Sequence, residues 1–187
     1  SEIGIPSKLF FKDEVKKYVL AENSGDFIFC EQKERLGTGH AVKQALPYLP
    51  ENGKTLVLYA DVPLVSLGTL RKLIRSCMRK KMSILTADID DPSGYGRIIR
   101  DKNDNPTLIR EQADATKAEK SIKEIFSGIM VIENKHLKKG VKGLVRSNVK
   151  GEYYLTDLVE FSSLRKHSVG TIKTDAVSYT HLRAHET

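Results

Sequence analysis

The sequence has few residues that could crosslink the chain or hold structural zinc. Its 187 residues include only two cysteines, Cys30 and Cys77, which are far apart and form no Cys-x-x-Cys pair. This pattern argues against a disulfide framework and against a structural zinc site. It favours two reduced, buried thiols in a cytoplasmic protein.

Long apolar runs and repeats are also absent from the sequence. No run approaches the roughly 20 apolar residues that a membrane-spanning helix needs. Residues 1–8 lack the apolar core of a signal peptide. The length and the 40% share of hydrophobic residues fit one ordinary globular domain, with no membrane partner expected.

Negative charge is scarcer than positive charge, because 24 Asp and Glu residues face 31 Lys and Arg residues, for a formal charge of +7. Such an excess favours anionic partners, among them nucleic acids, acidic lipids and phosphorylated metabolites. Much of the excess lies at helical spacing in one segment, at Arg71, Lys72, Arg75, Arg79, Lys80 and Lys81. We interpret this segment as a solvated helix face. No nucleic-acid recognition motif accompanies it, so no nucleic-acid partner is expected.

Apolar strands alternate with amphipathic helices along the chain. The expected strands are 27–30, 55–59, 83–86, 97–100, 107–110 and 128–132, and the expected helices are 10–22, 38–46, 67–80, 135–147 and 154–166. Strands 97–100 and 107–110 are expected to pair as a hairpin. The alternation predicts an α/β fold with an open, mostly parallel, Rossmann-like sheet, which would bind a ligand at the carboxyl ends of its strands.

Four short motifs carry most of the chemical information. They are LGTGHA at 36–41, LYADVPL at 58–64, DPSGYGRI at 91–98 and GEYYLTD at 151–157. The glycines beside Thr38 allow a flat ligand to approach the backbone, and the helix that follows offers free N–H groups to a base or phosphate. By itself, this glycine pattern is weak evidence for a ligand site, because any tight turn could have it.

Asp61 stands just past an expected buried strand, at the sheet edge where α/β proteins bind ligands. Magnesium keeps most of its water shell and needs only one or two carboxylates from a protein. The alternative is that Asp61 caps the turn before Pro63. On spacing alone, a metal ligand and a cap are equally good interpretations.

The other two motifs also have two interpretations each. Gly94 and Gly96 leave room for a ligand against bare backbone, or they only form a turn that an ion pair of Arg97 anchors. Tyr154 and Thr156 offer hydroxyls to a sugar, or Thr156 only caps a helix.

In this order, the four motifs resemble those of the N-acetylglucosamine-1-phosphate uridylyltransferases, a family of sugar nucleotidyltransferases. The resemblance covers Gln32 to Asp157. It implies that UTP and N-acetylglucosamine 1-phosphate are converted to UDP-N-acetylglucosamine and pyrophosphate with Mg²⁺ as cofactor, in bacterial cell-wall synthesis. The resemblance implies that uracil is bound by Gln32, Gly37 and Thr38, and that Tyr59 and Ala60 line the nucleotide and the sugar. It further implies that the acetamido sugar is bound by Gly96, Glu111, Tyr154 and Thr156. The implied magnesium ligand is Asp61.

The sequence also departs from the family pattern. Phe126 stands where the family has an asparagine facing the sugar, and a phenyl ring cannot replace the hydrogen bonds of an amide. The Gly-rich phosphate loop and a second magnesium ligand find no match. The family's homo-oligomers form through an acetyltransferase domain, whose hexapeptide repeats are absent from this sequence.

We therefore expect residues 1–176 to be a partial nucleotidyltransferase domain, lacking its first βα unit and having little turnover. Residues 177–187 show no apolar periodicity and are expected to be a non-native or disordered tail. His181 and His185 could form a zinc pair in this tail, but no third ligand is apparent. Two alternative functions are transfer to another sugar phosphate and non-catalytic binding of a nucleotide sugar.

Overall fold

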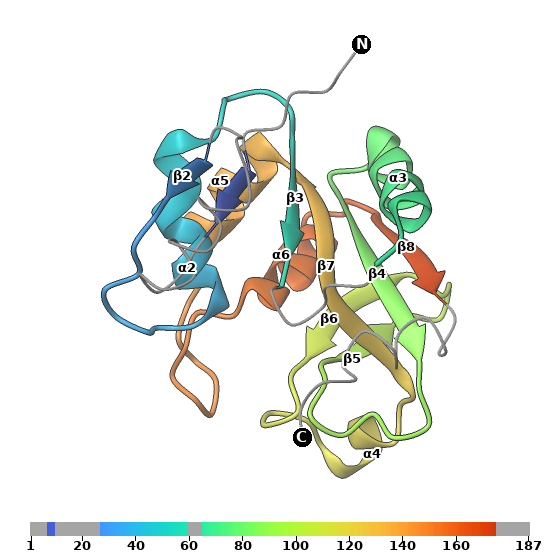
Figure 1. Ribbon diagram of the computed structural model, residues 1–187. Coiled ribbons are helices and arrows are strands. Elements are labelled where there is room, and N and C mark those ends of the chain that lie inside the picture. Colours follow the sequence, from blue (N-terminus) through green and yellow to red (C-terminus); the bar gives the residue numbers. More distant parts are fainter. Residues whose placement is uncertain (1–6, 10–26, 60–64, 175–187) are drawn as a thin grey trace.

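The computed structural model describes residues 7–9, 27–59 and 65–174 (Figure 1). Its centre is a six-stranded sheet, with strand order β6-β5-β7-β4-β8 and with β3 also paired to β7. The strands are β3 (Lys54–Leu58), β4 (Met82–Asp88), β5 (Arg97–Arg100), β6 (Pro106–Arg110), β7 (Glu124–Glu133) and β8 (Val169–Thr174). Two short strands, β1 (Ser7–Leu9) and β2 (Phe27–Phe29), pair in parallel as a separate sheet.

Strand β7 determines how the central sheet is connected. It pairs antiparallel with β3, β4 and β5, whereas β4 and β8 pair in parallel. Strands β3, β4, β5 and β8 consequently run the same way, although β7 separates β3 from β4. The predicted α/β fold is confirmed, but most neighbouring strands form antiparallel ladders because of this inserted strand.

Helices cover both faces of the sheet (Figure 1). They are α2 (Thr38–Ala45), α3 (Leu67–Ser76), α4 (Lys117–Lys120), α5 (Asn134–Lys142) and α6 (Leu158–Leu164), with 3-10 turns η1 (Leu46–Tyr48), η2 (Cys77–Arg79) and η3 (Leu155–Asp157). Apolar residues of α2, α5 and α6 pack against one face, and Leu73 of α3 packs with Cys77 against the other. None of the described helices is both long and apolar enough to cross a membrane.

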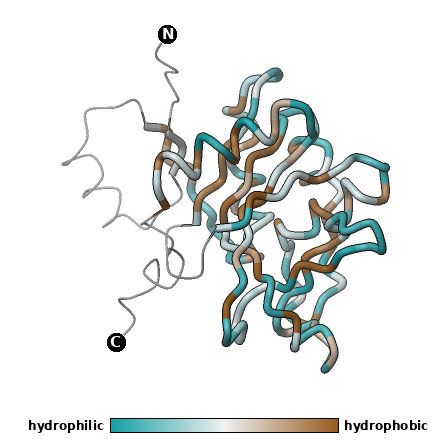
Figure 2. The backbone as a smooth tube through the Cα atoms, turned by 90° about the vertical axis from the view of Figure 1, so that its right-hand side faces the viewer, coloured by the Kyte–Doolittle hydropathy of each residue, from teal (hydrophilic) through white to brown (hydrophobic). Residues whose placement is uncertain are grey.

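The core surrounds β7, whose side chains alternate between the two faces. Phe126 and Met130 join the cluster under α5 and α6, while Ile125 and Ile129 join the cluster under α3. Because both faces are covered, the strand is apolar almost throughout, and many of the brown segments of Figure 2 lie in the middle of the molecule. Cys77 is fully buried here, as predicted.

Most predicted elements are confirmed, with shifted ends. The hairpin of β5 and β6 pairs as expected. The helix predicted at 135–147 ends at Lys142, with Gly143 as its C-cap. Strand β8 was not predicted, and the helix predicted at 10–22 lies outside the described residues.

His136 on α5 makes the stability of the fold depend on pH. It is buried, its Nε2 lies 2.7 Å from the Ser162 hydroxyl of α6, and its ring contacts those of Phe161 and His167. Burial, aided by the nearby His167, lowers the pKa of His136 to about 4. The folded state therefore holds a neutral imidazole over a range where the unfolded chain binds a proton.

We expect acid to destabilise the fold through this histidine. The contribution of His136 is complete above the unfolded pKa near 6.5 and is lost as the pH falls toward about 4, with a size of about 2 kcal/mol after allowance for solvent screening. Urea unfolding between pH 7 and pH 4 measures it. Because Asp157 titrates in the same range, the comparison is with His136→Gln, whose stability should fall less steeply with acid. Equal pH slopes would refute this role.

Candidate functional site

Two of the sequence motifs meet beside the start of α2. The amide of Tyr153 donates to the carbonyl oxygen of Leu36 at 2.8 Å, and the amide of Gly39 donates to the carbonyl oxygen of Tyr153 at 2.8 Å. The amide of Leu155 donates to Oγ1 of Thr38 at 3.0 Å. The LGTGHA loop and the GEYYLTD segment, far apart in sequence, therefore form one structural unit.

The glycines of the loop permit this close contact. Gly37 has φ 99° and ψ 176°, a conformation that residues with a Cβ rarely adopt. A Cβ on Gly37 would lie 2.7 Å from the carbonyl oxygen of Tyr153, and one on Gly39 would lie 3.0 Å from the same atom. The space beside the two glycines is therefore occupied by residues 152–153 of the chain itself. The amide of Gly39, in the first turn of α2, already donates its hydrogen bond to Tyr153.

Gln32 and His40 hold the loop from its other side. Nε2 of Gln32 donates to the carbonyl oxygen of Gly37 at 3.1 Å and lies 3.0 Å from Nδ1 of His40. Nε2 of Gln44 lies 3.2 Å from the other ring nitrogen of His40. The imidazole of His40, a residue to which the sequence analysis gave no role, is thereby fixed between two amides and stacked on Tyr153.

Three residues predicted to contact a sugar come together on the neighbouring side. The hydroxyl of Thr156 donates to Oε1 of Glu111 at 2.8 Å, so Thr156 is not a helix cap. A Cβ on Gly96 would lie 3.6 Å from both carboxylate oxygens of Glu111 and 2.7 Å from Ile109. Burial raises the pKa of Glu111, and the hydrogen bond from Thr156 opposes this shift.

Tyr154, the fourth residue of this set, places its buried hydroxyl beside the carboxyl of Asp114. The hydroxyl and Oδ2 of Asp114 are close enough to interact but do not have the geometry of a full hydrogen bond. Burial and the Asp114 carboxyl raise the pKa of Tyr154. Oδ1 of Asp114 accepts a hydrogen bond from the amide of Val149 at 2.8 Å.

This part of the site concentrates acidic groups. Burial, with the charges of Glu160, Glu111 and Asp114 nearby, raises the pKa of Asp157 to about 6. Asp114 was missed by the sequence analysis, although its position three residues after Glu111 in a polar turn was a usable signal. Such an acceptor-rich surface suits ligands with many hydroxyl and amide donors.

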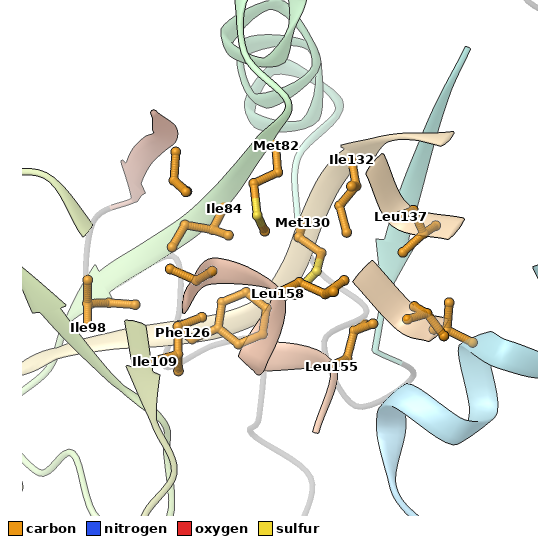
Figure 3. Close-up of a cluster of buried hydrophobic side chains, with 14 of the residues drawn as sticks. Met82, Ile84, Ile98, Ile109, Phe126, Met130, Ile132, Leu137, Leu155 and Leu158 are labelled. Atoms are coloured by element: carbon orange, nitrogen blue, oxygen red, sulfur yellow. The ribbon is translucent and has the colours of Figure 1, made fainter. Parts of the chain in front are cut away.

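Tyr59 borders the site at the end of β3. Its amide donates to the carbonyl oxygen of Gly128 at 3.2 Å, and a Cβ on Gly128 would lie 2.9 Å from its ring. The Tyr59 and Phe126 rings meet edge to face, with centroids 6.0 Å apart. Phe126 itself is buried and lies among Ile109 and Leu158 in the core (Figure 3).

The structure leaves two predicted residues undetermined. Ala60 and Asp61 lie outside the described residues, and so does the tail at 177–187 with its histidines. Within the described part of the chain, no group of three or more His, Cys, Asp or Glu side chains could hold a metal ion.

Arg97 has a different role from the expected ion pair. It is fully buried, and its guanidinium donates to Oε1 of Gln112 at 2.7 Å and to the carbonyl oxygen of Tyr95. Burial lowers the pKa of Arg97. The arginine therefore anchors the loop before β5 by hydrogen bonds, within the described residues.

The bond between Thr156 and Glu111 gives a testable expectation. Thr156→Val keeps the side-chain volume but leaves a buried carboxylate oxygen without its donor, so the free energy of unfolding should fall by about 1 to 2 kcal/mol. The pKa of Glu111 should rise further, which an NMR titration of the carboxyl carbon can follow. Thr69→Val, at a more exposed threonine of α3, is the control. An unchanged Glu111 pKa would show that the bond does not form.

Comparison with known proteins identifies close relatives. No family model matches the chain. It is 52% identical over 135 residues to the bifunctional protein GlmU of Cupriavidus taiwanensis, a match that covers 72% of this chain and 30% of that protein. The bifunctional protein GlmU of Nitrosomonas eutropha is 49% identical over 138 residues, with 73% and 30% covered. The chain thus spans about 30% of the length of these relatives.

Two solved structures share the fold at low sequence identity. A putative glucose-1-phosphate thymidylyltransferase from Bacillus anthracis has a TM-score of 0.69 at 16% identity, covering 95% of this chain and 74% of that one. HddC from Yersinia pseudotuberculosis has a TM-score of 0.62 at 19% identity, covering 94% and 75%. Over the matched 135 to 138 residues, the chain is homologous to one part of the bifunctional GlmU proteins, about 30% of their length.

Proposed function

We propose that this chain is the nucleotide-binding part of a sugar-phosphate nucleotidyltransferase that converts UTP and N-acetylglucosamine 1-phosphate to UDP-N-acetylglucosamine and pyrophosphate. The observation that carries the proposal is the meeting of the LGTGHA and GEYYLTD motifs beside Glu111, in a chain 52% identical to a GlmU protein. Relatedness supports the class of reaction, and the acceptor-rich surface supports a ligand with many donors.

Each part of the site would hold one part of the substrates. The LGTGHA loop, with Gln32, Gly37 and Thr38, would take the uracil. Tyr59 and Ala60 would line the path between the nucleotide and the sugar. The acetamido sugar would lie on the other side of the GEYYLTD segment, against Gly96, Glu111, Tyr154 and Thr156.

The proposed reaction needs positioning more than side-chain chemistry. An oxygen of the sugar phosphate attacks the α-phosphorus of UTP, a new oxygen–phosphorus bond forms, and the bond to the β-phosphate breaks with release of pyrophosphate. Two anions must be held in line, which the rigid pairing of the two motifs would favour. The shared hydrogen bonds among residues 36–39 and 153–155 fix the loop before any ligand arrives.

Asp61 would hold Mg²⁺ in this proposal. In the sequence it follows Tyr59 by two residues, shortly after β3 ends at Leu58. A single carboxylate is sufficient for the protein's share of a magnesium site, since water and phosphate oxygens supply the other ligands. Bound Mg²⁺ would neutralise part of the charge that the triphosphate carries.

Phe126 favours one alternative, transfer to a different sugar phosphate. Its ring is buried against Tyr59 and the core, so it offers no hydrogen bond where related enzymes are expected to offer an amide. A substrate without the acetamido group would lose less from this exchange.

Pyrophosphate release distinguishes these functions. The release is measured in the presence of Mg²⁺ with UTP or another nucleoside triphosphate, each combined with N-acetylglucosamine 1-phosphate or another sugar 1-phosphate. The control is the Asp61→Ala variant. We expect the highest rate, even if slow, with UTP and N-acetylglucosamine 1-phosphate. A higher rate with another pair would establish the alternative substrate, and binding without any turnover would indicate a non-catalytic nucleotide-sugar domain.

A further inference from the structure

A cavity of about 390 Å³ opens at the edge of the sheet opposite the candidate site. The strand ends fix its position: β4 and β8 begin there, and β7 ends there at Glu133. In Figure 1 this is the edge from which the arrows of β4 and β8 start. The candidate site lies at the other edge, where β3 ends before Tyr59. The two places are therefore separated by the length of β3, whose first residue, Lys54, pairs with Glu133.

Basic side chains dominate the walls of this cavity. The charged and ring-bearing residues that line it are Arg79, Lys80, Lys81, Lys166, His167 and Glu133. Four permanent cations thus face one carboxylate. Ser168 adds a hydroxyl at the rim.

The contacts of these residues show which charges are free. Nζ of Lys81 lies 2.9 and 2.8 Å from the two carboxylate oxygens of Glu133, so this pair is neutralised internally. Nζ of Lys80 donates to the carbonyl oxygen of Val169 at 3.5 Å. Arg79 and Lys166 have no ion pair within the described residues. The cavity therefore keeps an uncompensated positive charge.

Lys166 occupies a backbone position that usually belongs to glycine. Its φ is 57°, and the amides of Lys166 and His167 donate to the carbonyl oxygens of Ser163 and Ser162 at 2.9 and 3.0 Å, which closes α6 with a Schellman motif. A cation near a helix end is favourable, but Arg165 already fills that place by donating to the carbonyl oxygen of Phe161. Lys166 therefore adds a charge to the cavity that the helix does not require.

We propose that this cavity binds a small anion that carries two or more phosphate groups. Arg79 and Lys166 would be its main ligands, with Ser168 and the ring of His167 as further hydrogen-bonding groups. Arginine and lysine form strong, charge-assisted hydrogen bonds with phosphate oxygens, and the volume is within the range of small-molecule sites. This inference does not depend on the proposed function, because it concerns the opposite edge of the sheet.

Inorganic pyrophosphate is the probe, added to the whole chain in magnesium-free buffer at fixed ionic strength and followed by two-dimensional amide NMR. We expect the amides of residues 79–81 and 166–168 to shift with a common dissociation constant. Lys166→Gly removes the charge while relieving the backbone, so it should remain folded, and it should weaken binding about tenfold, as should Arg79→Gln. Lys72→Gln, an equal change of charge on the exposed face of α3, should leave binding within about twofold.

Two results with the variants would overturn the proposal. One is unchanged pyrophosphate affinity in both Lys166→Gly and Arg79→Gln. The other is equal weakening by Lys72→Gln, which would show that the anion responds only to net charge. Shifts confined to residues 36–39 and 153–156 would also contradict it, because pyrophosphate would then bind at the candidate site alone.

Discussion

Gly37→Ala is expected to lower the free energy of unfolding by about 3 kcal/mol and to abolish binding of the nucleotide sugar. Gly37 has φ 99° and ψ 176°, and an alanine Cβ would lie 2.7 Å from the carbonyl oxygen of Tyr153. The loop must therefore move away from the GEYYLTD segment, which breaks the hydrogen bonds that join the two motifs. Urea unfolding and calorimetric titration with UDP-N-acetylglucosamine measure the two effects.

Gly68→Ala is the matched control. Gly68 lies in the first turn of α3, has no left-handed conformation and has only the Ser66 hydroxyl within 4 Å, at 3.6 Å from an added Cβ. Alanine in a helix is favoured over glycine by about 0.5 to 1 kcal/mol, so this variant should be slightly more stable. If both variants behaved alike, the special conformation of Gly37 would not matter to the fold.

Phe126→Asn is expected to have two opposite effects. The buried ring packs against Tyr59 and the core under α6 (Figure 3), so its loss and the burial of an amide should cost about 4 kcal/mol of stability. Binding of UDP-N-acetylglucosamine should nevertheless tighten by about tenfold, since the amide supplies hydrogen bonds that a phenyl ring cannot. Measurements at low temperature keep the variant folded during the titration.

Phe126→Leu separates these effects, because leucine restores apolar packing without adding an amide. It should cost about 1 kcal/mol and should leave the affinity for the nucleotide sugar unchanged. Tighter binding by Phe126→Leu would mean that ring size, and not hydrogen bonding, controls the sugar site. No gain with Phe126→Asn would mean that position 126 does not face the sugar.

The strands and helices could be predicted where periodicity was clear. Residues 97–100 and 107–110 have the alternation of a hairpin and form β5 and β6. Residues 128–132 are only the second half of β7, because the polar Ser127 and the terminal Glu124 interrupt the apolar pattern. Both polar residues are accommodated by hydrogen bonds: the Ser127 hydroxyl donates to the carbonyl oxygen of Leu85, and the Arg100 guanidinium donates to the Glu124 carboxylate. No local sequence pattern reveals these partners.

The candidate site could be predicted as a set of residues but not as an arrangement. Sequence motifs indicated Gly37, Thr38 and Thr156, yet the bonds that tie residues 36–39 to 153–155 depend on chain segments more than 100 residues apart. Asp114 was missed because a lone carboxylate in a turn has many structural uses. The structure adds that the Asp114 carboxyl lies beside the buried Tyr154 hydroxyl and raises its pKa.

Calorimetric titration with UDP-N-acetylglucosamine tests most directly whether the joined motifs form a nucleotide-sugar site. We expect saturable binding to the unaltered chain and about tenfold weaker binding to Glu111→Gln. Binding to Glu51→Gln should be unchanged, because Glu51 is an exposed carboxylate that precedes β3, whereas Tyr59 follows the other end of this strand. The absence of detectable heat at millimolar ligand, or equal affinities of the unaltered chain and Glu111→Gln, would contradict the proposed site.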